Sequence, residues 1–193
     1  MADPKRRVFI LGWDGATFDL IKPWVAKGHL PTIARLMEAG SHGPLASTQP
    51  PMTFPAWSSF MTGKNPGKHG LFDFIEPVAE GQGFRFTNAT SRQSETLWGC
   101  LSRHGRKVGV LNVPMTYPPE PVNGYLISGL DTPDERSPFL HPQGLREELA
   151  TNKIEYRIDI QHLGNMRTDR QRDERLHELS EVETLRTRAL HDL

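Results

Sequence analysis

Residues 7–16 read RVFILGWDGA, an apolar, β-rich run that ends in an aspartate and a glycine. The run shows no alternation of polar and apolar residues, which is typical of a strand buried on both faces in the middle of a parallel sheet. The carboxylate of Asp14 would then lie at the carboxyl end of that strand, where open α/β sheets bind their ligands. We therefore expect an α/β fold in which Asp14 either ligates a divalent cation or caps the next turn or helix.

A hydroxyl and a proline lie close together at the start of the segment Thr53–Gly63, which reads TFPAWSSFMTG. Pro55 can open a helix, the apolar residues after it fit a helical turn, and Gly63 can end it. Thr53 would lie at the helix N-terminus, where backbone N–H groups and the helix dipole favour an incoming anion. Two roles remain open for Thr53, attack on a phosphate or sulfate ester and capping of the helix.

Other helices and strands are expected to alternate along the chain. The pattern predicts a helix over 31–40, a strand over 44–47, a loop or small hairpin over 76–94, a helix from 96 that ends near 105, and strands over 107–113 and 125–129. A strand, a helix and another strand in this order indicate a parallel sheet flanked by helices. Asp131 follows the last strand and either contacts substrate or metal or forms a turn with the next residues.

The last part of the chain is rich in charge and carries regularly spaced apolar residues. Leu176, Leu179, Val182, Leu185 and Ala189 recur at steps of three or four. This spacing predicts a helix over 167–193 with one apolar stripe. The helix either covers the sheet or binds a partner helix.

Composition narrows the class of protein. The 193 residues suffice for one domain with a real core, and 23 basic and 23 acidic residues give no net charge that would attract nucleic acid. The apolar run before Asp14 is too short for a membrane span or for the core of a signal peptide. The single cysteine, Cys100, excludes an internal disulfide and fits a reducing compartment. We expect a cytoplasmic protein without nucleic-acid or membrane partners.

Several short blocks in a fixed order resemble one known group of enzymes. The blocks are ILGWDGA at 10–16, LPTIARL at 30–36, TFP at 53–55, TG at 62–63 and HGL at 69–71. Together they resemble the type I phosphodiesterase/nucleotide pyrophosphatase branch of the alkaline phosphatase superfamily, and several blocks in order are more specific than any one of them. The resemblance is strongest over 7–75 and continues through 95–98 and 107–114.

The resemblance implies a phosphoester site with two divalent metal ions, usually zinc. Asp14 matches the first metal ligand of the family. Thr53 matches the nucleophile, which is also metal-bound and is transiently phosphorylated before water releases the product. The substrate would be a small phosphoester, more readily a diester than a monoester.

Three further residues bear on substrate binding. Asp73 stands where the nucleotide pyrophosphatases carry an asparagine that helps to bind a phosphate oxygen, and an ionised aspartate cannot donate to a phosphate and would repel it. Asp73 would instead bind a cation or a sugar hydroxyl, or cap a turn. Lys64 and Lys68 flank the loop after the Thr53 helix and either contact the phosphate or are solvated.

The remaining metal ligands of the family have no counterpart in this sequence. No Asp-His-Gly run follows residue 135, and none of the later histidines (His141, His162, His177 and His191) lies in a matching motif. We therefore expect residues 1–193 to be the N-terminal portion of a single alkaline phosphatase-like catalytic domain with an incomplete, mostly parallel sheet. Two functions follow: a metal-dependent phosphoric ester hydrolase that stops before most of its metal ligands, or an inactive remnant that binds an anion or a partner.

Overall fold

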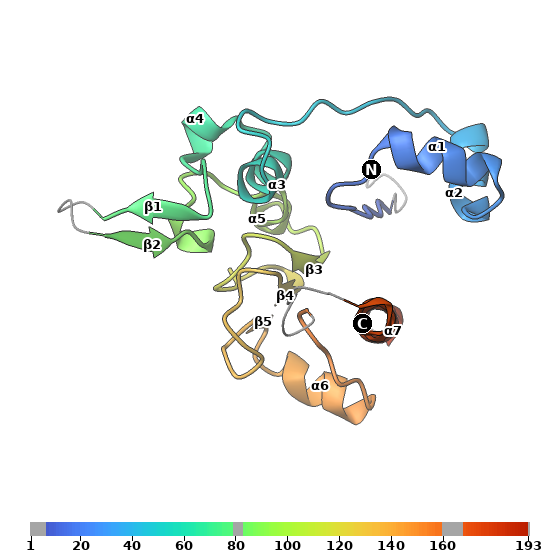
Figure 1. Ribbon diagram of the computed structural model, residues 1–193. Helices are drawn as coiled ribbons and strands as arrows, with labels where there is room; N and C mark the ends of the chain where they lie inside the picture. The colour runs from blue at the N-terminus through green and yellow to red at the C-terminus, as the bar shows by residue number, and fades with distance from the viewer. Residues whose placement is uncertain (1–6, 79–82, 160–167, 193) are drawn as a thin grey trace, which may run out of the picture. The chain divides into compact units, whose positions relative to one another are not determined.

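The computed structural model describes residues 7–78, 83–159 and 168–192. Its helices and strands are labelled in Figure 1. The chain divides into two compact units, Met1–Ser47 and Thr48–Leu193. The prediction of one catalytic domain over the whole chain stays a prediction.

The first unit contains two helices, α1 (Phe18–Ala26) and α2 (Pro31–Ala39). Helix α2 begins with Pro31 and ends at Gly40, as the sequence predicts. The apolar residues 8–13 form no strand and are exposed, and residues 44–47 form none either. Both strand predictions are therefore wrong. The physical reason is that a strand exists only where a neighbouring strand takes up its backbone N–H and C=O groups, and the described part of this unit contains none.

The second unit is built on a three-stranded sheet of β3 (Val108–Val113), β4 (Gly124–Ser128) and β5 (Leu140–His141). Strands β3 and β4 are parallel, and β5 lies antiparallel beside β4. The strands predicted over 107–113 and 125–129 and the α/β class are thus confirmed. The expectation of a mostly parallel sheet is corrected. The three-stranded sheet contains one parallel and one antiparallel pairing, and β3–β4 is the only parallel pairing among the described residues. With 7–13 outside any sheet, the candidate first parallel strand is missing from it.

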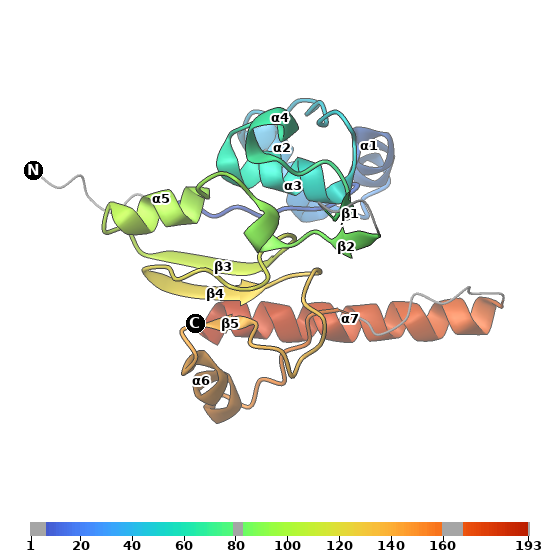
Figure 2. The same ribbon diagram turned by 90° about the vertical axis from the view of Figure 1, so that its left-hand side faces the viewer.

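Helices cover both faces of this sheet. On one side lie α3 (Thr53–Thr62), α4 (Pro66–His69) and α5 (Leu97–Arg103), and on the other lie α6 (Leu145–Thr151) and α7 (Asp169–Asp192) (Figure 2). The alternation of side chains along β4 explains the two cores. Leu126 joins a cluster with residues of α3 and α5, whereas the next residue, Ile127, joins a cluster with residues of α6 and α7.

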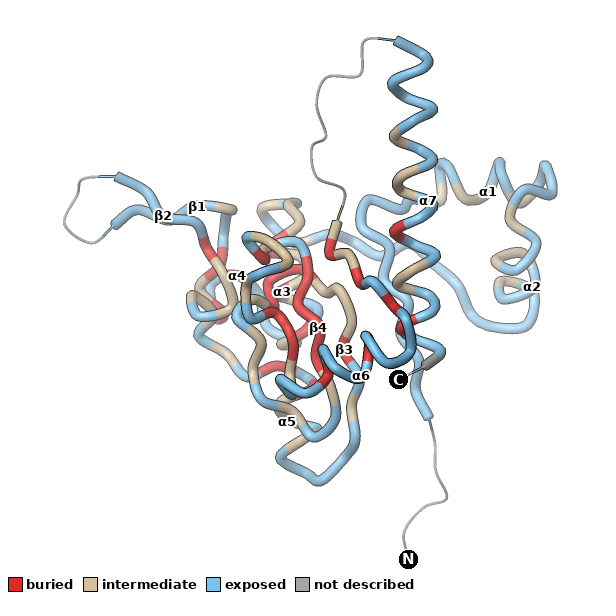
Figure 3. Tube along the Cα trace, turned by 90° about the horizontal axis from the view of Figure 1, so that it is seen from below, coloured by how far each residue is buried: buried red, intermediate tan, exposed pale blue. Residues whose placement is uncertain are grey.

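The terminal helix predicted over 167–193 is confirmed over Asp169–Asp192, and residues 160–167, with His162, lie outside the described residues. Val182 and Ala189 are fully buried, so the C-terminal half of α7 packs on the unit. The N-terminal half is mostly exposed, as Figure 3 shows by colour. The apolar stripe therefore covers the sheet over part of its length. No helix in the described ranges is both long and apolar enough to cross a bilayer.

The polar segment 76–94 contains the small hairpin that the sequence allowed. Strand β1 (Ile75–Pro77) pairs antiparallel with β2 (Phe84–Phe86), and a short 3₁₀ helix, η1 (Ala89–Ser91), follows. Val78 donates a backbone hydrogen bond to Gly83 across the end of the ribbon, at 3.2 Å. Figure 1 shows that the ribbon extends away from the rest of the second unit.

Candidate functional site

Thr53 is the first residue of α3, where the sequence placed it. The helix has Met52 as its N-cap residue and no side-chain capping bond, so the capping role considered for Thr53 is absent. Thr53 is half-buried, and its hydroxyl makes no hydrogen bond with any residue that the structure describes. At the other end Gly63 adopts a left-handed conformation (φ 65°) that glycine tolerates best and that stops the helix. An unused hydroxyl thus lies beside the free N–H groups of a ten-residue helix.

An aromatic contact brings Asp73 to the first turn of α3. The rings of Phe54 and Phe74 pack with their centroids 4.2 Å apart, and Phe74 directly follows Asp73. The Asp73 side chain is exposed and accepts a hydrogen bond from the Phe74 N–H at 2.6 Å. The Asp73 carbonyl accepts another from the buried hydroxyl of Thr87 at 2.8 Å. The residues that follow Thr53 and Asp73 in the chain therefore contact each other, and one carboxylate oxygen of Asp73 is used in its own turn.

Lys64 and Lys68 follow α3 in the chain, beyond the helix end opposite Thr53. Lys64 follows the C-terminal end of α3, and a helix of ten residues is about 15 Å long. Lys68 belongs to α4, which packs against α3. Both lysines are exposed and form no ion pair within the described residues. Their part in phosphate binding stays a prediction.

Asp14 belongs to the first unit. It lies in a turn with Gly15, which has a φ of 66°, and it is exposed. The residue that caps the following helix is Thr17, whose hydroxyl accepts from the Asp19 N–H at 3.3 Å. Asp14 therefore does not cap α1, and its carboxylate makes no hydrogen bond to any described residue. Thr53 belongs to the second unit, so the two predicted metal ligands are placed each within its own unit.

The described residues offer few side chains that could ligate a metal ion together. Among residues 7–78, 83–159 and 168–192 no three His, Cys, Asp or Glu side chains gather closely enough to hold an ion. A catalytic zinc ion normally has three protein ligands and a water. The described residues therefore do not fit the two-zinc site that the resemblance implies, although Asp14 and Thr53 are of suitable chemistry.

Comparison with protein families identifies the group to which these residues belong. The model of the type I phosphodiesterase/nucleotide pyrophosphatase family matches residues 8–186. The chain belongs to this family. No curated protein matched the chain, and no solved structure matched it either. At the level of the family, membership implies hydrolysis of small phosphoesters, by phosphodiesterase or pyrophosphatase chemistry.

In this phosphodiesterase family member, a buried histidine joins the Thr53 helix to α4. His69 is completely buried, and its Nδ1 accepts a hydrogen bond from the Leu71 N–H at 3.2 Å. In the neutral ring the proton is therefore on Nε2, which donates to the Ser59 hydroxyl at 3.0 Å. Because Nε2 carries the proton, His69 positions Ser59 and does not act as its base. No local sequence signal indicates this pairing, since the two residues are ten positions apart.

His69 makes the stability of the folded chain depend on pH. Burial lowers the pKa of the imidazole below 6.5 and the charge of Arg92 acts in the same direction, while a hydrogen bond with the Pro55 backbone opposes both. The unfolded chain thus binds a proton at a higher pH than the folded chain does. Stability should therefore fall as pH is lowered from about 6.5 through the lower pKa of the folded state.

Urea unfolding between pH 7.5 and pH 5 tests this expectation, with pH limits chosen to bracket an ordinary histidine pKa of about 6.5. His69→Gln should flatten the dependence, because glutamine keeps a donor but does not titrate. His177→Gln removes an exposed histidine of α7 and should leave the dependence as it is. An unchanged slope in His69→Gln would refute the assignment.

Asp131 shapes the loop that follows β3. Its Oδ1 accepts from the N–H groups of Met115 and Thr116 at 2.9 and 3.3 Å, and its Oδ2 accepts from Tyr117 at 2.9 Å. Met115 is fully buried and left-handed, with a φ of 65°, a conformation that non-glycine residues seldom adopt. Burial raises the pKa of the Asp131 carboxyl, and these backbone hydrogen bonds oppose the rise. The Asp131 carboxylate therefore holds the loop after β3 and not a turn with the residues that follow it, and its contact to substrate or metal stays a prediction.

Asp131→Asn should lower the free energy of unfolding by about 1–2 kcal/mol, because the amide nitrogen would face a backbone N–H where an oxygen now accepts. Equilibrium unfolding in urea measures the loss. Asp134→Asn is the matched control, since Asp134 also accepts from backbone N–H groups but its side chain is 43% exposed. Equal losses in the two variants would mean that burial of the Asp131 bonds adds nothing.

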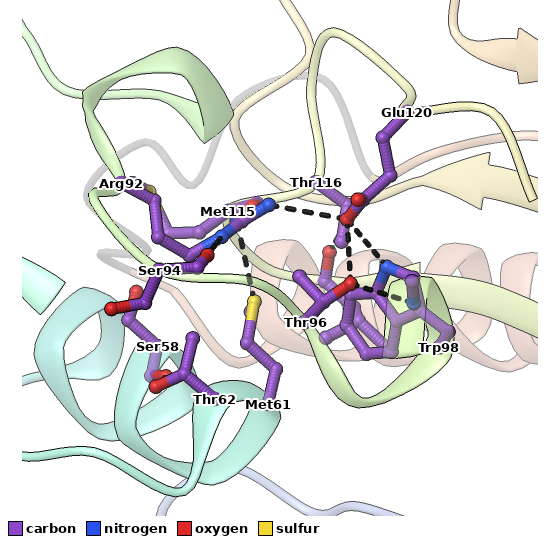
Figure 4. Close-up of polar contacts among 12 residues, drawn as sticks. Ser58, Met61, Thr62, Arg92, Ser94, Thr96, Trp98, Met115, Thr116 and Glu120 are labelled. Atoms are coloured by element: carbon purple, nitrogen blue, oxygen red, sulfur yellow. Dashed lines mark hydrogen bonds and ion pairs between the residues drawn. The ribbon is translucent and has the colours of Figure 1, made fainter. Parts of the chain in front are cut away.

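Arg92 is the other residue that sequence analysis did not find. Its side chain is 6% exposed and connects three parts of the second unit (Figure 4). Nη1 donates to the Met115 carbonyl at 2.9 Å and lies 3.4 Å from the sulfur of Met61 in α3. Nη2 donates to Glu120 at 3.2 Å. The same Glu120 oxygen accepts from Thr96 at 2.9 Å and from the Trp98 indole at 2.7 Å, so one carboxylate holds the start of α5 as well.

Proposed function

We propose that this chain carries the nucleophile of a phosphoric ester hydrolase that acts on phosphodiesters through a phospho-threonine intermediate at Thr53. One observation carries the proposal: the Thr53 hydroxyl begins a helix of ten residues, is half-buried, and is not used as a cap. Capping is the ordinary role of a threonine at the N-cap position, which Met52 holds here. A hydroxyl that is not so used is available to a ligand.

The chemistry is a displacement in two halves. The Thr53 oxygen attacks phosphorus, the bond from phosphorus to the leaving alcohol breaks, and the alcohol departs with the proton that Thr53 gives up. Water then attacks the phosphorylated threonine, which restores the hydroxyl and releases a phosphate monoester. The free N–H groups at the start of α3 and the helix dipole favour the negative charge of the phosphoryl group next to Thr53.

The family resemblance implies two divalent ions, usually zinc. Such ions would supply the activation that a threonine hydroxyl, a weak nucleophile at neutral pH, otherwise lacks. We propose Asp14 and Thr53 as metal ligands of this chain and Asp73 as a contact to substrate or cation. The described residues supply fewer ligands than an ordinary zinc site needs, so the proposed reaction steps are assigned to Thr53 and the helix terminus alone.

The test is covalent trapping. The chain is incubated with bis(4-nitrophenyl) phosphate, with and without added zinc, quenched in acid, and digested for mass spectrometry. The expected product is a 4-nitrophenyl phosphoryl group on the peptide that contains Thr53. The group should be present in the parent chain and in Thr53→Ser, and absent in Thr53→Ala. A modified peptide that does not contain Thr53 would refute the assignment.

The small donor set favours a second candidate, an inactive member that binds an anion or a partner. Elemental analysis of protein purified without chelator, followed by assay in excess zinc, separates the two. Two bound zinc ions per chain with release of nitrophenol would support the hydrolase. No bound zinc and no turnover, with orthovanadate binding that Thr53→Ala weakens, would support the binding protein.

A further inference from the structure

The first turn of α3 carries the groups that would meet a phosphoester at Thr53. Thr53 supplies the hydroxyl, and the backbone N–H groups of Thr53 and Phe54 donate to no residue that the structure describes. Pro55 has no N–H, and the Ala56 N–H already donates to the Met52 carbonyl at 3.0 Å. The turn therefore offers one hydroxyl and two N–H donors, and their use depends on where the turn is held.

His69 joins α4 to this first turn. Its Nδ1 accepts from the Leu71 N–H, so the proton that the neutral ring donates is on Nε2. Nε2 lies 3.0 Å from the Ser59 hydroxyl, and the ring also makes a hydrogen bond with the Pro55 backbone. Because proline has no N–H, the Pro55 carbonyl is the acceptor. One imidazole N–H is thus shared between a carbonyl of the first turn of α3 and a hydroxyl of the second.

His69 is itself held firmly on the side away from α3. Its carbonyl accepts from the Gln93 N–H at 2.9 Å, and the Gly70 N–H donates to the Pro66 carbonyl at 2.9 Å and closes α4. The side chain of His69 is completely buried, so the ring has no solvent into which it could turn. The imidazole is therefore a fixed point on which the first turn of α3 rests.

His69 and Thr53 belong to opposite faces of α3. At 3.6 residues per turn each residue advances about 100°, which places Pro55 about 200° and Ser59 about 240° around the helix from Thr53. Contacts at these two positions hold the back of the helix and leave the face of Thr53 free. His69 therefore acts on a reaction at Thr53 only through the position of α3.

We infer, on the basis of the proposed function, that His69 is a positioning residue for the Thr53 nucleophile. Its Nε2–H ties the first turn of α3 to α4 and so sets the direction of the Thr53 hydroxyl and of the two N–H donors. Attack on phosphorus needs an oxygen in line with the leaving group, and a misplacement of about 1 Å can cost about 10²-fold in rate. Binding of the phosphoester demands less of that direction. Loss of the tie should therefore lower kcat and leave KM nearly unchanged.

Two variants of His69 separate the bond to α3 from the rest of the ring. Glutamine is long enough to keep a donor at the place of Nε2, whereas the shorter asparagine keeps only an acceptor for the Leu71 N–H. With bis(4-nitrophenyl) phosphate, His69→Asn should lower kcat about 10²-fold, and His69→Gln should stay within about threefold of the parent chain. His104→Asn is the matched control, because the His104 ring also bonds a helix carbonyl, that of Cys100 at 2.8 Å, but in α5.

Amide hydrogen exchange, followed by NMR, tests the tie without reference to activity. In His69→Asn the Ala56 N–H, whose bond closes the first turn, should exchange at least about tenfold faster, because that turn opens locally. The Gly63 N–H, which donates to the Ser59 carbonyl at the other end of α3, should exchange as in the parent chain. Exchange of Ala56 at the parental rate, or a parental kcat, would overturn the inference.

Ser59→Ala provides a second variant, which removes one acceptor and leaves His69 in place. It should change the exchange of Ala56 and kcat in the same directions by smaller factors, and a Ser59→Ala chain identical to the parent in both would also overturn the inference. Far-UV circular dichroism of each variant reports whether the fold is kept. If the parent chain shows no turnover, the proposed function fails by itself, and the exchange of Ala56 still decides whether His69 holds the turn.

Discussion

Thr53→Ala should lower kcat for phosphodiester hydrolysis by at least ~10³-fold, the scale of loss when an enzyme nucleophile is removed. Thr53→Ser keeps a hydroxyl at the first residue of α3 and should retain measurable turnover. Initial rates of nitrophenol release from bis(4-nitrophenyl) phosphate measure both. The prediction rests on the half-buried hydroxyl that no described residue uses.

The stability of the Thr53→Ala variant tests the role of Thr53 independently of activity. If Thr53 capped α3, its replacement by alanine would cost about 1 kcal/mol. Because Met52 is the N-cap residue and no side-chain cap bond is made, we expect the unfolding midpoint of Thr53→Ala to stay close to that of the parent chain. Loss of activity without loss of stability is the signature of a nucleophile. A clear loss of stability would return Thr53 to a structural role.

Thr62→Ala is the matched control at the other end of α3. The Thr62 hydroxyl donates to the Ser58 carbonyl at 2.6 Å, a local bond within the helix. Its removal should leave kcat essentially unchanged. If Thr62→Ala and Thr53→Ala reduce turnover equally, the helix rather than the Thr53 hydroxyl is what the reaction needs.

Local signals explain which elements could be predicted from the sequence. The Thr96 hydroxyl caps α5 by accepting a hydrogen bond from the Gly99 N–H, and Gly63 ends α3. One end of each helix is therefore marked by a residue at that end. Strands β3 and β4 also agree with their apolar runs. The run at 8–13 has the same composition but forms no strand, because pairing depends on a partner elsewhere in the chain. Composition does not encode that partner.

The residues of the candidate site also differ in whether their roles could be predicted from the sequence. Pro55 and Gly63 place Thr53 at a helix start, so its position could be predicted within the segment itself. His69 and Arg92 could not be predicted, since each acts through residues far along the chain. A buried arginine in a polar segment has the same sequence signature as a solvated one. Only the packing of α3 against the loop after β3 distinguishes them.

Arg92→Met should lower the free energy of unfolding by about 3 kcal/mol, because removal of one partner from a buried ion pair costs ~3–5 kcal/mol and Glu120 keeps some solvent. Burial lowers the pKa of the Arg92 guanidinium, and Glu120 opposes that shift. Arginine stays protonated in proteins, so the charge remains in the unit and needs its partners. In Arg92→Met the Met115 and Ser94 carbonyls also lose a hydrogen-bond donor. Equilibrium unfolding in urea measures the change.

Arg103→Met tests whether burial or hydrogen-bond geometry decides how much an ion pair contributes to stability. Arg103 and Glu95 form two bonds, at 3.1 and 3.0 Å, which is a better arrangement than the one bond of 3.2 Å between Arg92 and Glu120. The Arg103 pair is open to solvent, with side chains 61% and 49% exposed. Exposed pairs contribute little to stability. We therefore expect Arg103→Met to unfold almost like the parent chain. If Arg103→Met lost as much stability as Arg92→Met or more, the buried position of Arg92 between α3, the loop after β3 and Glu120 would contribute nothing.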